Sequence, residues 1–176
     1  LSVRGLEKHV PVRSGVLRII NGAAPSGLRF AAHLAIYSGG CAGVLSVTAK
    51  PGVFSPAPML FVHGDADDYA YLSDCRSYAQ RINAAGTPTE LVVLPGVRHK
   101  FDVDDPRRVN ARNNTKTKEG CPLEFDIADM KMRDRRSGDV VPQDKIKAIS
   151  EELCADKGAT REGDTKAREA AGKAVV

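Results

Sequence analysis

Residues Pro58–Asp68 read PMLFVHGDADD, and residues Thr89–His99 read TELVVLPGVRH. Each stretch contains a continuous apolar run, which is typical of a strand covered on both faces of a parallel sheet. Between the two stretches, apolar residues recur at helical spacing, at Leu72, Cys75, Tyr78, Ala79 and Ile82. Gly86 follows them and is placed to end a helix. Strand, helix and strand joined by short links predict a right-handed crossover unit.

The flanking sequence extends this pattern on both sides. Phe30–Tyr37 is a mostly apolar run that predicts another strand, whereas residues 1–27 form a poorly defined N-terminal segment. Residues 28–176 therefore read as one α/β unit, a parallel sheet flanked by helices, with a polar excursion at residues 102–141. Hydrophobicity alternates in Leu123–Ile127, which is compatible with a small hairpin or with an excursion over the surface.

Two helices are predicted towards the C-terminal end. Pro142 is placed to open a helix through about Lys157, with Ile146, Ile149 and Leu153 on one stripe and Gly158 as its stop. A second helix is predicted from Thr165 to Val176, where helix-forming residues are frequent.

The composition of the chain limits the kinds of function that it can have. The chain has 176 residues, 42% hydrophobic and 27% charged, as expected of one globular domain. It has no apolar run of the ~18 residues that a membrane span needs, so we expect no membrane role. The net charge is +4, and the basic residues after position 97 alternate with acidic ones. A mixed-sign solvated surface is therefore expected rather than a nucleic-acid interface, with a basic binding module at Arg107–Lys118 as the alternative.

The four cysteines are Cys41, Cys75, Cys121 and Cys154. Their spacing matches no metal-binding motif, so no metal site is predicted. They could form two disulfides in any of three pairings, or remain buried free thiols. The redox compartment decides between these possibilities.

Asp67 and His99 are the candidate catalytic residues. Asp67 lies on the loop after one predicted strand, and His99 follows the next. Because sites in open α/β sheets form at the carboxyl ends of the strands, the two side chains are expected to meet there. In a catalytic triad the carboxylate orients the histidine and stabilises the imidazolium that forms when the histidine takes the proton of the nucleophile. His63 is expected to shape the loop that holds Asp67, and Asp65 to be a turn residue.

The Asp67 and His99 contexts resemble the C-terminal half of the dienelactone hydrolase family, which belongs to the α/β-hydrolases. The resemblance covers roughly residues 28–176 and is most specific in Pro58–Asp68 and in Leu94–Asp102 (LPGVRHKFD). It implies a partial α/β-hydrolase fold that lacks the N-terminal strands. It also implies hydrolysis of a small carboxylic ester or lactone by a Cys or Ser nucleophile, with Asp67 as the acid and His99 as the base. No organic cofactor or metal is implied.

The chain departs from this family at the nucleophile, because no Gly-x-Ser-x-Gly elbow or cysteine equivalent occurs in it. The nucleophile is expected to be missing from this chain. Ser2 is a weak candidate, and Cys41 is better explained as a structural cysteine. If the cysteines pair, the preferred pairs are Cys41–Cys75 and Cys121–Cys154, because each would tie nearby loops and helices. Two disulfides would favour a periplasmic or secreted protein over a cytoplasmic one. The alternative function is a catalytically inactive fragment or an interaction domain.

Overall fold

A three-stranded parallel sheet forms the centre of the computed structural model, which describes residues 30–41 and 46–175. The poorly defined segment at residues 1–27 lies outside these ranges. Strands β1 (His33–Ile36), β2 (Met59–Gly64) and β3 (Thr89–Leu94) lie in the order β1-β2-β3. Both neighbouring pairs are parallel, as the sequence predicts.

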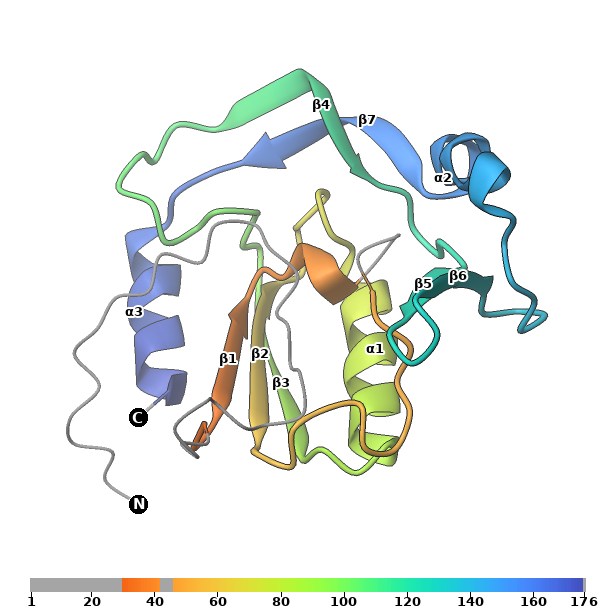
Figure 1. The fold of residues 1–176 in the computed structure, drawn as a ribbon. Coiled ribbons are helices and arrows are strands. Elements are labelled where there is room, and N and C mark those ends of the chain that lie inside the picture. Colours follow the sequence, from red (N-terminus) through yellow and green to blue (C-terminus); the bar gives the residue numbers. More distant parts are fainter. Residues whose placement is uncertain (1–29, 42–45, 176) are drawn as a thin grey trace.

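Two helices cover opposite faces of this sheet, as Figure 1 shows. Because side chains alternate along a strand, Met59 and Phe61 of β2 pack with α1 (Leu72–Ala84). Val62 instead packs in the cluster that contains Ala167 and Ala171 of α3 (Thr165–Val175). The described part of the chain therefore has a three-layer α/β arrangement, which agrees with the predicted fold class.

An antiparallel ribbon crosses the carboxyl ends of the parallel strands (Figure 1). It consists of β4 (Val109–Thr117) and β7 (Ala155–Arg161), whose pairing is interrupted between Ala111 and Thr115. The predicted helix from Pro142 to about Lys157 is wrong at its C-terminal end, since the α-helix ends at Leu153 and the next residues form β7. Gly158 does not stop a helix but lies within this strand, at a positive φ of 81°.

A small hairpin and a short helix form a separate hydrophobic cluster. The hairpin consists of β5 (Leu123–Asp126) and β6 (Lys131–Asp134), so the structure has the first of the two possibilities that the sequence leaves open. A 3-10 turn at Gln143–Lys145 leads into α2 (Ile146–Leu153). The cluster is built around Leu123, Met132 and Val141 together with a disulfide.

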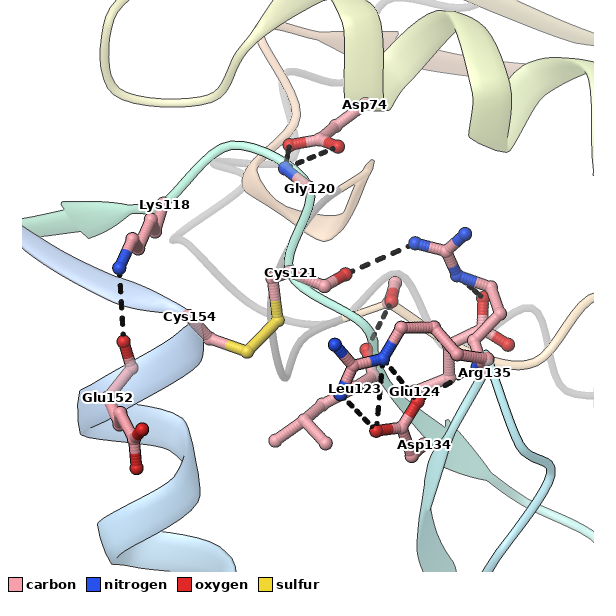
Figure 2. The surroundings of a disulfide bond; sticks show 12 residues. Asp74, Lys118, Gly120, Cys121, Leu123, Glu124, Asp134, Arg135, Glu152 and Cys154 are labelled. Carbon is pink, nitrogen blue, oxygen red and sulfur yellow. Dashed lines mark hydrogen bonds and ion pairs between the residues drawn. A yellow bond between two sulfur atoms is a disulfide. The ribbon is translucent and has the colours of Figure 1, made fainter.

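Both preferred cysteine pairs are present as disulfides. Cys41, at the end of a 3-10 turn (Gly39–Cys41), is bonded to Cys75 of α1. Cys121 and Cys154 join the start of the hairpin to the end of α2, as Figure 2 shows. These bonds are compatible with an extracellular or periplasmic location. Within the described ranges, no helix is both long and apolar enough to cross a membrane.

Candidate active site

Two loops converge at the carboxyl ends of β2 and β3. The backbone N–H of Asp65 donates to the carbonyl of Leu94, and that of Ala66 donates to the carbonyl of Val97. Gly64 allows this approach, because a Cβ at that position would collide with the carbonyl of Val97. Asp65 accepts a hydrogen bond from the backbone of Gly96 at 2.6 Å, which confirms its role in the turn.

Asp67 is fixed on the loop after β2 by its own neighbours. Its Oδ1 accepts hydrogen bonds from the backbone N–H groups of Tyr69 at 2.8 Å and Ala70 at 3.0 Å. These bonds form a local turn of the kind that an aspartate side chain favours. The carboxyl group is fully buried, and its second oxygen remains for a side-chain partner.

That partner is His99. Its Nδ1 donates to Oδ2 of Asp67 at 2.9 Å, and the imidazole is about nine-tenths buried. A proton held on Nδ1 by the carboxylate leaves the lone pair of a neutral imidazole on Nε2, which is the form required of a general base. The structure therefore brings together the two residues that the sequence singles out.

The ribbon also holds both site loops. Oδ1 of Asp68 accepts a hydrogen bond from the backbone N–H of Thr160 at 2.7 Å. The carbonyl of His99 accepts one from the N–H of Glu162 at 3.1 Å, just beyond β7. The polar excursion that the sequence leaves largely undefined thus leads into an element that stabilises the site.

His63, at the end of β2, contacts the loop that carries Asp67. Its Nε2 donates to the carbonyl of Ala70 at 2.7 Å and lies 3.6 Å from Oδ2 of Asp67. The imidazole is almost completely inaccessible to solvent, and its Nδ1 lies 3.7 Å from Sγ of Cys75. These contacts agree with the predicted role of His63 in shaping the loop.

We expect His63 to make the protein less stable in mild acid. Burial lowers the pKa of His63 from 6.5, while the negative charge of Asp67 opposes this effect. Below pH 6.5 the unfolded chain binds a proton that the folded imidazole resists, so the free energy of unfolding falls with decreasing pH, by up to about 1.4 kcal/mol for each unit between the two pKa values. Urea unfolding at pH 7.5 and 5.5 measures this difference.

His63→Asn should reduce the loss of stability between these two pH values. His33→Asn is the comparison variant. Burial also lowers the pKa of His33, but this side chain is less enclosed and lies on β1, so its replacement should reduce the loss by a smaller amount. An unchanged pH dependence in His63→Asn would contradict the assignment.

The described part of the chain provides no nucleophile at either position that the sequence suggests, Ser2 or Cys41. Ser2 lies outside the described residues. Cys41 is bonded to Cys75, so it is not a free thiol.

Within residues 30–41 and 46–175, no group of three or more His, Cys, Asp or Glu side chains is arranged to hold a metal ion.

Two tyrosines that the sequence did not single out contact His99. The ring of Tyr69 stacks on the imidazole, with centroids 4.4 Å apart and planes 23° apart. The ring of Tyr37 contacts it edge-on at 4.7 Å. Burial, followed by the hydrogen bond to Asp102, raises the pKa of the Tyr37 hydroxyl well above its ordinary value. In the sequence, the only indication of the contact between Tyr37 and His99 is that Tyr37 lies at the end of a predicted strand.

Comparison with known proteins gives limited, partial likenesses. No family model and no curated protein matches the chain. It is similar to the thermophilic esterase Est2 of the planctomycete Thermogutta terrifontis, with 32% identity over 30% of this chain and 18% of that one, and a TM-score of 0.27. It is also similar to esterase PE8, with 20% identity over 43% of this chain and 34% of that one, and a TM-score of 0.35. The chain therefore spans about a third or less of the length of either esterase, and likenesses of this size carry no argument about function.

Proposed function

We propose that Asp67 and His99 are the acid and the base of a nucleophile–His–Asp triad that hydrolyses carboxylic esters or lactones. The observation that carries the proposal is the buried hydrogen bond of 2.9 Å between Nδ1 of His99 and Oδ2 of Asp67. The two residues follow neighbouring parallel strands, in the order acid then histidine that α/β-hydrolases use. Within this class, the sequence resemblance favours a dienelactone hydrolase-like enzyme.

The chemistry follows from the orientation of the imidazole. Nε2 of His99 removes the proton from a hydroxyl or thiol nucleophile as that group attacks the ester carbonyl. Asp67 stabilises the resulting imidazolium, which then gives its proton to the leaving alkoxide. Water attacks the acyl-enzyme in the second half of the reaction, with His99 again as the base. The nucleophile is supplied by sequence outside the described residues: Ser2, or residues that precede Leu1 in a longer parent protein.

A catalytically inactive or interaction domain is the second candidate. The observation that favours it is the apolar surface beside β1, which pairs only with β2 among the described strands. Phe30 is 68% exposed just before this strand, and Leu34 is exposed within it. Strand edges with exposed apolar side chains favour pairing with another chain.

Hydrolysis of p-nitrophenyl acetate separates the two candidates when it is combined with labelling by a fluorophosphonate for a serine nucleophile and by iodoacetamide for a cysteine nucleophile. We expect turnover, and a single labelled Ser or Cys in the peptide map, in the form of the protein that carries the nucleophile. The chain that begins at Leu1 and any longer natural protein that contains it are both assayed. Absence of turnover and labelling in both forms would reject the hydrolase and favour the interaction domain.

A further inference from the structure

The hydrogen bond to Asp67 does not by itself fix the plane of the His99 imidazole. A single bond at Nδ1 leaves the ring free to tilt about the Nδ1–Oδ2 direction, which would displace Nε2 from a fixed target. A general base must lie within hydrogen-bond reach of the proton that it abstracts, so this orientation matters for the reaction. Contacts on the ring itself can supply the missing restraint.

Tyr69 combines two contacts at the centre of the site. Its ring stacks on the imidazole, while its backbone N–H donates to Oδ1 of Asp67. Its carbonyl accepts hydrogen bonds from both the backbone N–H and the hydroxyl of Thr117 in β4, the latter at 2.7 Å. The residue that stacks on the base is therefore tied to the acid and to the ribbon.

Tyr37 is held against the imidazole in an unusual backbone conformation. It follows β1 at a φ of 37°, a region that residues other than glycine rarely adopt and that is often found at functional sites. Its backbone N–H donates to the carbonyl of Val62, its hydroxyl donates to Asp102 at 2.7 Å, and its ring contacts Phe101 edge-on at 5.5 Å. The end of β1 is thereby joined to the segment that carries His99.

We propose that Tyr37 and Tyr69 are positioning residues that confine the imidazole of His99 to one orientation, an inference that rests on the function proposed above. Each of the three parallel strands then contributes to the site at its carboxyl end: an aromatic ring after β1, the acid and a second aromatic ring after β2, and the base after β3. The electron-rich face of Tyr69 also attracts the positive charge that His99 acquires during the reaction. Both effects require an aromatic ring, and neither requires the Tyr69 hydroxyl.

The low-field proton NMR signal of the His99 Nδ1–H, assigned by its loss in His99→Gln, reports this orientation directly. We expect a sharp signal in the wild type and in Tyr69→Phe. In Tyr69→Leu the signal should broaden or disappear through exchange with water, and Tyr37→Leu should weaken it less. Tyr71→Leu is the matched control, because Tyr71 contacts Lys116 rather than His99. Equal unfolding midpoints of Tyr69→Leu and Tyr71→Leu would exclude a general loss of structure.

Kinetics on p-nitrophenyl acetate provide the second measurement. Tyr69→Leu should lower kcat by roughly tenfold to a hundredfold, as expected for a misplaced catalytic group, with KM within about twofold of wild type and full recovery in Tyr69→Phe. A sharp signal retained in folded Tyr69→Leu, or no such signal in the wild type, would overturn the proposal. If the signal changes as expected but no form of the protein hydrolyses esters, the function proposed above fails while the positioning of His99 stands.

Discussion

His99→Ala should lower kcat/KM for p-nitrophenyl acetate by roughly 10⁶-fold in the form of the protein that carries the nucleophile. The substitution removes both the group that accepts the nucleophile's proton and the group that protonates the leaving alkoxide. Asp67→Asn should reduce the rate by roughly 10⁴-fold, because an amide can hold the imidazole in the wrong tautomer while preserving its position. Initial rates over a range of ester concentrations measure both effects.

His33→Ala is the control for replacing a histidine of this sheet. His33 lies at the start of β1, at the opposite end of the strand from Tyr37. The His33→Ala substitution should therefore leave the rate within about twofold of wild type. The double variant His99→Ala/Asp67→Asn should be no slower than His99→Ala alone, since the members of a triad act as a unit. Multiplicative losses in the double variant, or a His99→Ala rate near that of wild type, would contradict the triad.

Removing the Cys121–Cys154 disulfide should cost roughly 3.7 kcal/mol of unfolding free energy at 25 °C, from the loop-closure relation applied to a sequence separation of 33. The bond restricts the unfolded chain, and its half-cystines also belong to the small cluster around Leu123 and Met132. Urea unfolding of Cys121→Ala/Cys154→Ala under non-reducing conditions measures the loss.

The second disulfide offers a matched comparison. Cys41–Cys75 closes a loop of nearly the same length, with a separation of 34, so chain entropy alone gives the same cost for Cys41→Ala/Cys75→Ala. Equal losses in the two double variants would support the entropic origin. A loss below about 1 kcal/mol in Cys121→Ala/Cys154→Ala would show that the remaining contacts hold the hairpin and α2 together.

The sequence predicted those parts of the fold in which the pattern is local. The apolar runs of β2 and β3 and the helical spacing in α1 are properties of short windows, and the order of these elements fixes which strand ends meet. The contact between Asp67 and His99 could therefore be predicted without knowledge of the rest of the chain. The hairpin of β5 and β6 could be given as one of two possibilities for the same reason, because its alternation occurs within a few residues.

Elements that depend on distant partners could not be predicted in this way. Ala155–Arg161 contains good helix formers, yet it pairs with β4 as β7, so tertiary pairing overrides local propensity. Strand β4 contains three Asn and one Lys, residue types that strands do not favour. The contacts of Tyr37 and Tyr69 with His99 likewise depend on the conformations of three separate loops, which no spacing rule specifies.

The ribbon over the strand ends has a consequence for biosynthesis. The hydrogen bond between Asp68 and Thr160 joins residues 92 positions apart. The hydrogen bond between His99 and Glu162 also requires β7 and the residue that follows it. A nascent chain emerging from the ribosome can pair its parallel strands early, yet these tethers form only after β7 has been translated. Asp67 and His99 are thus translated before the residues that complete their surroundings.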